Sequence, residues 1–340
     1  MGQQQLLYSR QLNKTVSWKK FSELPLIYSA IADYIEQLKL TAQYQAVRGR
    51  CVEDQDHPIE VWSFLPPSPS QRPIVLMGGM GPFAGIVGLD LACQYFGNKR
   101  EIVLYQACSI PSRMTVMQAP HRLIDGFPLN QYLVQQVSRA IAQATEYLQS
   151  DAADIIIILL CNAVHYFLPQ IKADLQKSYP KVAASVQYIS LIEAVIANLE
   201  KQKLHQPLLL GTSATKIGKV YSAPLNKHGI KYQQLSEVAQ EILMNIIYQG
   251  VKAFDQNYAC LKGEELFHLL LNSDLAMAGN FSLPRNNLHI DCVIAGCTEI
   301  PVLLDWLLAQ SQSSSIQSFL TQVKVINPVL SAFQEISSNG

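Results

Sequence analysis

Charged residues are scarce in this chain of 340 residues: Asp, Glu, Lys and Arg together make up 15% of it. The 26 basic side chains balance the 26 acidic ones, and no basic run stands out. A protein that holds nucleic-acid phosphates needs a basic face, so we expect no nucleic-acid partner. Hydrophobic residues make up 49% of the chain, which is enough for a large buried core and argues against disorder.

Long apolar runs and paired cysteine motifs are also missing. The most apolar stretch, residues 155–160, is far shorter than a membrane span of about 20 residues, so it predicts a buried strand and no membrane partner. The N-terminal segment lacks the apolar core of a signal peptide. The seven cysteines are an odd number and include no CxxC pair. We therefore expect a cytoplasmic protein that keeps its thiols free.

The first 70 residues differ from the rest of the chain. Apolar side chains in residues 22–48 recur on one face of a helix, and residues 59–65 have the pattern of a strand. The proline-dense residues 66–73 predict a linker, because proline fixes φ and removes a backbone donor. The sequence therefore predicts an N-terminal extension, residues 1–70, whose role it does not reveal.

From residue 73 onward, apolar strands alternate with helices. This alternation predicts an α/β fold with mainly parallel sheets, in which ligands bind beyond the carboxyl ends of the strands. The predicted strands cover residues 74–77, 102–106, 155–160, 186–191, 207–210, 231–235, 291–295 and 323–326. The predicted helices include residues 130–149, 163–176, 237–252, 263–273 and 299–309.

A weak internal repeat divides this region into two similar lobes. A strand that runs into Gly78 precedes, by 83 residues, a strand that ends at Cys161, and the interval from Gly211 to Cys297 is 86 residues. Each lobe therefore offers one glycine turn and one cysteine at corresponding strand ends. The predicted division is lobe 1 over residues 71–187, completed by residues 323–340, and lobe 2 over residues 188–322.

Both cysteines stand where a strand turns into a helix. Asn162 and Thr298, which follow them, are suitable N-caps. The free N–H groups and the dipole of a helix start are expected to lower the pKa of each thiol from its usual value of about 8.5. A single such cysteine is equally well explained as a small apolar core residue. Two matching turns in a repeated frame favour a functional pair.

Two thiols on opposite sides of a carbon are suited to inverting it. One thiolate removes the Cα proton from one face, and the other thiol returns a proton to the opposite face. The glycine turn at residues 77–82 matches neither the dinucleotide nor the P-loop pattern, and by itself it is explained by a tight turn. Paired with the turn at Thr212 and Ser213, it predicts a cradle for the charged groups of a small substrate, with donors that stabilise a carbanion-like transition state.

Three stretches resemble the signatures of aspartate racemases in the aspartate/glutamate racemase superfamily. They are GGMGP at residues 78–82, CNAVH at residues 161–165 and GCTEIP at residues 296–301, within a resemblance that covers residues 73–335. The usual forms in that family are GGMGP, CNTAH and GCTEI, whereas the glutamate branch has GCTHYP. The resemblance implies two α/β lobes with the active site in the cleft between them. It also implies a small amino-acid substrate, a homodimer, no cofactor and no metal.

The site residues follow by position. The resemblance assigns the acid/base roles to Cys161 and Cys297. Arg113 lies in an IPSR stretch that is similar to a family IPDR stretch, whose arginine holds a substrate carboxylate, although a solvated surface arginine is the alternative. Ala163 stands where the family often has Thr, and Gly85 where Thr or Ser is common. The expected substrate-binding residues are Met80, Gly81, Arg113, Asn162, Ala163, Thr212, Ser213, Thr298 and Glu299.

His165 follows Cys161 by four positions and so lies on the same helical face. It would tune the thiolate or bind substrate, or it would simply bond to the backbone at a helix start. A zinc site is a further alternative, since Cys161, His165, Cys292 and Cys297 are suitable ligand types. Their spacing matches no compact zinc pattern, so we predict no metal site.

These observations together predict a cofactor-independent enzyme that interconverts L- and D-aspartate. Three alternatives stay open: a glutamate or broad-specificity amino-acid racemase, an enzyme of the maleate isomerase or hydantoin racemase type, and a catalytically silent homologue that binds a ligand.

Overall fold

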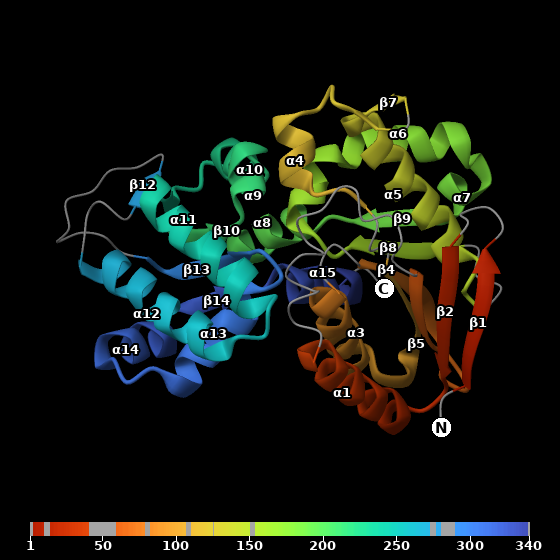
Figure 1. The fold of residues 1–340 in the computed structure, drawn as a ribbon, viewed down its shortest axis with the longest axis horizontal. Coiled ribbons are helices and arrows are strands. Elements are labelled where there is room, and N and C mark those ends of the chain that lie inside the picture. The colour runs from red at the N-terminus through yellow and green to blue at the C-terminus, as the bar shows by residue number, and fades with distance from the viewer. Residues whose placement is uncertain are drawn as a thin grey trace. The chain divides into compact units, whose positions relative to one another are not determined.

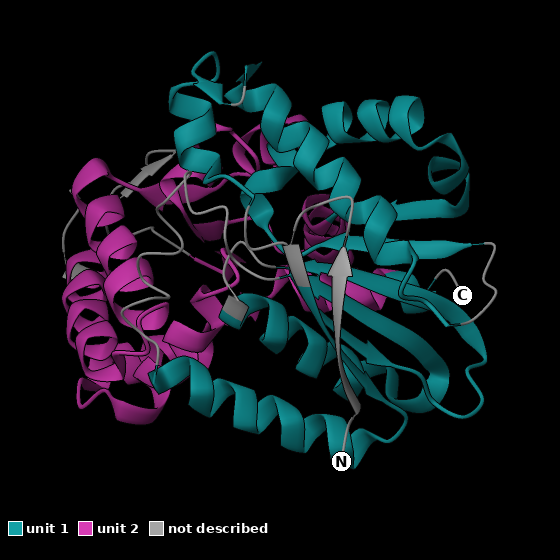
Figure 2. Cartoon of the chain, turned by 45° about the vertical axis from the view of Figure 1, so that its right-hand side comes forward, with its two compact units in different colours: residues 1–190, 336–340 teal, residues 191–335 magenta. Residues whose placement is uncertain are grey.

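The computed structural model describes residues 3–9, 14–40, 59–78, 82–106, 110–124, 126–149, 154–272, 277–279 and 290–338. The chain divides into two compact units, residues 1–190 with 336–340, and residues 191–335 (Figure 2). Each unit contains helices and its own sheet in which most neighbouring strands are parallel. The predicted fold class, two α/β lobes with mainly parallel sheets, is therefore confirmed.

The sheet of the first unit has seven strands in the order β1-β2-β3-β5-β4-β8-β9. The β5-β4-β8-β9 part is parallel throughout, β2 and β3 are also parallel, and the β1–β2 and β3–β5 pairs are antiparallel. The strands are β1 (Gln3–Ser9), β2 (Lys14–Phe21), β3 (Ile59–Phe64), β4 (Gln71–Gly78), β5 (Arg100–Gln106), β8 (Ile155–Leu159) and β9 (Val186–Ile189).

Helices cover both faces of this sheet (Figure 1). Strand β8 is buried along its whole length, as expected for a strand with helices on both sides, which is why its sequence is continuously apolar. The helices and the small hairpin of this unit are α1 (Leu24–Leu40), α3 (Pro82–Phe96), the 3₁₀ helix η1 (Gly97–Lys99), α4 (Arg113–Gln118), β6 (Leu123–Ile124), β7 (Phe127–Pro128), α5 (Leu129–Thr145), the 3₁₀ helix η2 (Asn162–Phe167), α6 (Leu168–Ser178) and α7 (Pro180–Ser185).

The described residues of the predicted N-terminal extension continue the sheet of the first unit. Strands β2 and β3 extend the main sheet through pairing of β3 with β5, and α1 packs against α3. Trp62 of β3 is 1% exposed and stacks on Phe21 at 5.8 Å between ring centroids. The predicted linker ends early, because β4 already begins at Gln71. The antiparallel pairing with β5 anchors this region to the sheet that also carries Cys161.

The sheet of the second unit has five strands in the order β12-β11-β10-β13-β14. All neighbours are parallel except β11 and β12. The strand at residues 324–326 pairs with β13, so it belongs to this unit and not to the first lobe as predicted. The strands are β10 (Pro207–Gly211), β11 (Gln233–Leu235), β12 (Met277–Gly279), β13 (Cys292–Gly296) and β14 (Lys324–Ile326).

The eight strands predicted from the sequence are all present within a few residues. Two predicted helices prove to be composite: residues 163–176 form η2 followed by α6, and residues 237–252 form α11 followed by a π-helix. The helices of this unit are α8 (Leu191–Gln202), α9 (Ser213–Ile217), α10 (Ser222–Lys227), α11 (Glu237–Asn245), the π-helix η3 (Ile246–Val251), α12 (Gln256–Asn272), α13 (Ile300–Gln310), α14 (Ser314–Gln322) and α15 (Pro328–Ser338), whose last turn is assigned to the first unit.

No helix in the described part of the chain has the length and apolar character needed to cross a membrane.

Candidate active site

The predicted repeat is visible in how the strands pair. In the first unit β4 and β8 are parallel neighbours, with Met77 opposite Leu159. In the second unit β10 and β13 are parallel neighbours, with Gly211 opposite Gly296. Because parallel strands end at the same sheet edge, the strand that runs into a glycine and the strand that precedes a cysteine end side by side in each unit.

Each cysteine turn contains the same kind of backbone hydrogen bond, from the residue three positions later to the cysteine carbonyl. The Val164 N–H donates to the carbonyl oxygen of Cys161 at 3.2 Å, and the Ile300 N–H donates to that of Cys297 at 3.1 Å. The predicted N-caps are wrong, however. Cys161 precedes η2 and Glu299 precedes α13 as the cap residue, and neither side chain makes a capping hydrogen bond. The repeat therefore lies in strand order and in a tight turn at each cysteine.

In the first unit, the residues after Cys161 are held in place by burial. Cys161 is partly exposed, whereas Asn162 and Ala163 are 3% and 6% exposed. His165 Nδ1 lies 3.0 Å from the carbonyl oxygen of Cys161. Burial lowers the pKa of His165 to about 4. The ring is therefore neutral near pH 7, and its Nδ1–H donates to the Cys161 carbonyl.

This geometry favours the structural role for His165. A neutral imidazole adds no positive charge that would lower the pKa of the neighbouring thiol. Its hydrogen bond instead holds the peptide of Cys161 and thereby the direction of that side chain. His165 is a support of the turn rather than a charged partner of the thiol.

Gln106 is a residue of this sheet edge that the sequence did not single out. It ends β5, is fully buried, and its side chain lies over Gly85 of α3. A Cβ at Gly85 would come within 2.1 Å of Gln106 Oε1. The absence of a side chain at Gly85 thus leaves the room that the Gln106 side chain of β5 occupies. The signal that could have indicated this was a polar residue at the end of an apolar strand.

Arg113 begins α4, and its Nη1 donates to the Pro111 carbonyl oxygen at 3.0 Å. The guanidinium is therefore partly used to close its own loop. Its predicted contact with a substrate carboxylate stays a prediction.

In the second unit, Cys297 and its neighbours form a compact polar cluster. Cys297 Sγ donates to Glu299 Oε2 at 2.8 Å, and Thr298 Oγ1 donates to the same oxygen at 3.1 Å. Glu299 is 4% exposed and Cys297 is 8% exposed. Lys252 Nζ lies 3.7 Å from the other oxygen, Glu299 Oε1. The Glu299 carboxylate thus lies between the Cys297 thiol and the Thr298 hydroxyl on one oxygen and the Lys252 ammonium group on the other.

Burial and the neighbouring charges reverse the expected shift in the pKa of the Cys297 thiol. Burial, followed by the negative charge of Glu299, raises the pKa of Cys297 well above its usual value, although Lys252 opposes this. Burial also raises the pKa of Glu299, but Lys252 and the donors from Cys297 and Thr298 outweigh it and lower that pKa overall. The prediction that the helix start lowers the pKa of both thiols is therefore wrong for Cys297. Burial of the thiol, together with a full negative charge in contact, outweighs the partial charge of a helix end.

Thr212 and Ser213 occupy the glycine turn of the second unit, after β10. Thr212 caps α9, where its Oγ1 accepts from the Thr215 N–H at 3.2 Å. The Ser213 N–H donates to the sulfur of Met244 at 3.3 Å. Gln240, which the sequence did not indicate, donates from Nε2 to the Gly211 carbonyl oxygen at 2.9 Å. Side chains of α11 thus hold this turn in place through hydrogen bonds.

Met80 and Gly81 lie outside the described residues, so their predicted role stays a prediction. Within the described residues, no three His, Cys, Asp or Glu side chains are grouped so that they could hold a metal ion.

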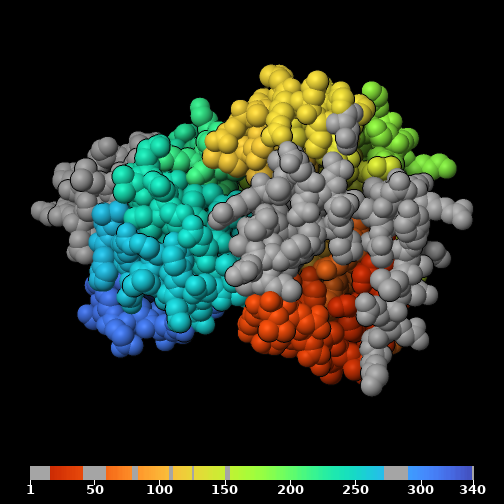
Figure 3. Space-filling view, in the orientation of Figure 1, coloured from red at the N-terminus to blue at the C-terminus, as the bar shows by residue number. Residues whose placement is uncertain are grey.

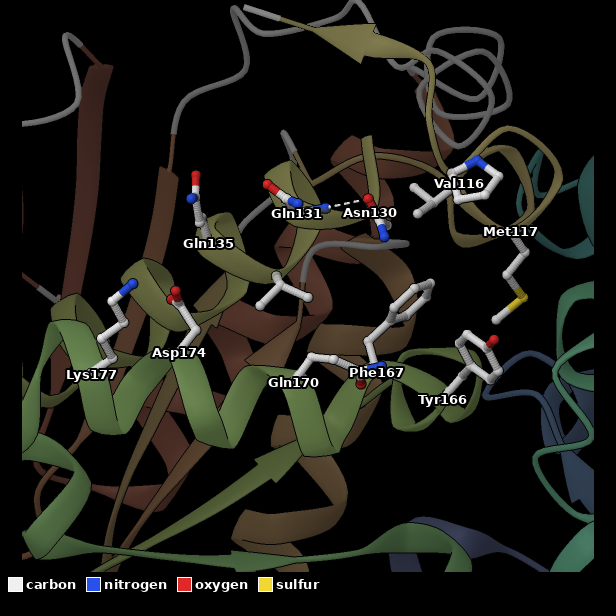
Figure 4. A pocket seen from close by; sticks show the side chains of 12 residues that line it. Val116, Met117, Asn130, Gln131, Gln135, Tyr166, Phe167, Gln170, Asp174 and Lys177 are labelled. Carbon is white, nitrogen blue, oxygen red and sulfur yellow. Dashed lines mark hydrogen bonds between the residues drawn. The ribbon is translucent and has the colours of Figure 1, made fainter. Parts of the chain in front are cut away.

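A surface hollow of about 390 Å³ lies entirely within the first unit (Figure 4). It is bordered by α4, α5, η2 and α6, and the end of α4 and start of α5 are at the molecular surface in Figure 3. Asp174 and Lys177 point from α6 toward Gln135 at one end, and Met117 and Tyr166 lie at the other. None of the predicted site residues lines this hollow, so we do not assign it to the chemistry of the cysteines.

Comparison with solved structures identifies the fold. The structure of an aspartate racemase from Picrophilus torridus is similar, with a TM-score of 0.54 at 19% sequence identity over 79% of this chain and 94% of that one. An aspartate racemase homologue from Pyrococcus horikoshii OT3 is similar with a TM-score of 0.50 at 19% identity over 79% of this chain and 99% of that one. No protein-family model matches the sequence. The chain thus has the fold of the aspartate/glutamate racemases, as the sequence motifs implied.

Proposed function

We propose that this protein is an amino-acid racemase that needs no cofactor and uses Cys161 and Cys297 as its two acid/base groups. The observation that carries the proposal is the repeated site: each unit ends a parallel strand in a cysteine turn, next to the strand of its glycine turn. The similarity to aspartate racemase structures supports the same activity.

In the proposed reaction, one thiolate takes the Cα proton and becomes a thiol. The other thiol gives its proton to the opposite face of the carbanion-like intermediate and becomes a thiolate. The pair therefore ends with the same charge and the reverse distribution of protons, which prepares it for the opposite enantiomer. The mechanism requires both sulfur atoms to reach one Cα from opposite faces.

We propose aspartate as the substrate, with glutamate or a broader range of amino acids as the alternative. The support is the GCTEIP motif and the aspartate racemases among the similar structures. Arg113 is the proposed partner of a substrate carboxylate, because a guanidinium binds a carboxylate through two parallel hydrogen bonds. Asn162, Ala163, Thr298 and Glu299 are proposed to line the same site, and the working form is proposed to be a cytoplasmic homodimer.

The test is incubation of the purified protein with single L-amino acids in deuterated water, followed by measurement of chirality and of deuterium at Cα. Racemisation of aspartate with one deuterium per inversion, unchanged by a chelator and without added cofactor, is the expected result. Racemisation that stops on dialysis against a chelator and returns with metal would contradict the proposed chemistry. Neither inversion nor exchange with any amino acid would favour the silent, ligand-binding homologue.

A further inference from the structure

The ammonium group of Lys252 is placed beside the Cys297 turn by an unusual helix. Residues 246–251 form a π-helix directly after α11, and Lys252 follows it. Gly250 of this helix packs on α12 so closely that a Cβ would come within 2.7 Å of Ala259 Cβ. A π-helix carries an extra residue per turn, so it changes the direction of the side chains that follow. The site of Lys252 is therefore determined by tertiary packing.

Lys252 and Glu299 form a nearly buried ion pair, with side chains 11% and 4% exposed. Such a pair is costly to desolvate, and it is weak evidence for a purely stabilising role. The second carboxylate oxygen of Glu299, Oε2, accepts a hydrogen bond from the Cys297 thiol at 2.8 Å. The order of contacts is thus ammonium, carboxylate, thiol, and it ends on a residue with a proposed catalytic role.

We propose that Lys252 is a positioning residue of the racemase site: its ammonium group pairs with Glu299 and partly offsets the negative charge of that carboxylate, so that Cys297 rests as a thiol that donates to Glu299 yet can still be ionised. This inference rests on the proposed function. Cys297 then supplies the acid of the resting pair, and Cys161 is left to supply the base. The charged pair does not touch the substrate carbon; it sets the protonation state of the sulfur that does.

Among the described residues, three titratable groups act on the Cys297 thiol: Glu299 in the same turn, Lys252 after the π-helix, and Tyr221 before α10. Tyr221 is fully buried and its pKa is raised by burial, so it is neutral at ordinary pH. Lys252 also lies over the ring of Tyr248, 4.6 Å from its centroid, an arrangement that favours the charged amine. Glu299 and Lys252 are therefore the charges that control the thiol.

The two charges are expected to have opposite effects on the reactivity of Cys297. Glu299→Gln removes the adjacent negative charge, so the thiolate forms more easily. Lys252→Met removes the positive charge, so the thiolate forms less easily. Glu299 touches the thiol, and a charge in contact shifts a pKa by about 1–3 units, so Glu299→Gln should raise the thiolate fraction and the alkylation rate about tenfold or more. Lys252 contacts the carboxylate, so Lys252→Met should lower the alkylation rate by a smaller factor. Lys252→Arg keeps the charge and should restore most of the wild-type behaviour.

The experiment measures alkylation of Cys297 by iodoacetamide from pH 6.5 to pH 10 in the full-length protein, with the modified peptide quantified by mass spectrometry. Lys262→Met is the matched control, because Lys262 pairs with Glu265 at 2.6 Å on the exposed face of α12. Circular dichroism and thermal unfolding of each variant show whether it is folded. The expected result is faster alkylation in Glu299→Gln, slower alkylation in Lys252→Met, and wild-type rates in Lys252→Arg and Lys262→Met.

A shift in the same direction for Lys252→Met and Glu299→Gln would overturn the inference, because loosening of the structure alone speeds alkylation in both. Equal effects of Lys252→Met and Lys262→Met would also overturn it. Alkylation requires no substrate, so its outcome is independent of the racemisation assay. Opposite shifts without any racemisation would retain the charge relation and reject the proposed function. Racemisation without opposite shifts would support the proposed function and reject the inference about Lys252.

Discussion

The neutral state of buried His165 predicts a specific loss of stability in mild acid. Its pKa in the folded protein is about 4 because of burial, whereas an unfolded chain has a histidine pKa of about 6.5. Between these two values the unfolded chain binds a proton that the folded protein does not. The free energy of unfolding therefore falls as pH falls through this window, by about 2 kcal/mol at pH 5 and about 3 kcal/mol below pH 4.

The substitution His165→Asn isolates the contribution of His165 to the pH dependence of the free energy of unfolding. An Asn side-chain N–H can replace Nδ1–H as the donor to the Cys161 carbonyl, a bond of 3.0 Å in the wild type, but Asn does not titrate. The variant should therefore lose about 2 kcal/mol less than the wild type when the pH is lowered from 7.5 to 5. The control is His228→Asn, which removes a partly exposed histidine that bonds to Glu200 at 2.7 Å.

The assay is urea unfolding at both pH values, followed by tryptophan fluorescence. A Trp306→Phe background leaves Trp18 and Trp62 as reporters, and both belong to the first unit, which also holds His165. The reasoning is refuted if His165→Asn loses as much stability between pH 7.5 and pH 5 as the wild type does. It is also refuted if His228→Asn reduces the pH dependence as strongly.

Three further predictions concern the cysteines, the N-terminal region and the substrate. Cys161→Ala and Cys297→Ala should each lower racemisation of aspartate by about 10²-fold or more while the protein stays folded, since each removes one positioned proton-transfer group; near-wild-type turnover in either variant would disprove the two-base mechanism. Trp62→Ala should reduce the free energy of unfolding by about 3–5 kcal/mol, because Trp62 is 1% exposed in the sheet; Leu26→Ala, at a side chain 37% exposed, is the control, and equal small losses in urea titrations would mean that residues 1–70 contribute little. Arg113→Ala should reduce activity on aspartate about 10- to 150-fold more than on a neutral amino acid, and an unchanged preference across a substrate panel would reject Arg113 as the carboxylate partner.

The sequence alone determined the strands and the repeated frame. Apolar runs such as residues 155–160 have no other stable place than a sheet that is covered on both faces, so their positions follow from composition and spacing. The cysteines at corresponding strand ends follow from the same pattern. Motifs of a few residues were sufficient to indicate the aspartate racemase fold, although only 19% of residues are identical to those of the similar structures.

Only the tertiary structure decided where the described strands of the N-terminal extension belong. Strand β3 joins the sheet through antiparallel pairing with β5, a contact between segments about 40 residues apart that no local pattern encodes. The same is true of the strand at residues 324–326, which pairs with β13 rather than with the first unit. Strand pairing is chosen by the whole set of competing edges, and local propensity does not contain that information.

The charge on the catalytic candidates was likewise decided by tertiary contacts. The motif GCTEIP identifies Cys297 and Glu299, and a helix start next to a thiol predicts a lowered pKa. The structure instead buries the thiol, places the Glu299 carboxylate 2.8 Å from its sulfur, and brings Lys252, which follows the π-helix and lies 47 residues earlier in the chain, to that carboxylate. A pKa depends on burial and on charges within a few ångströms, and both are properties of the folded chain, so the sequence could name the thiol but not its protonation state.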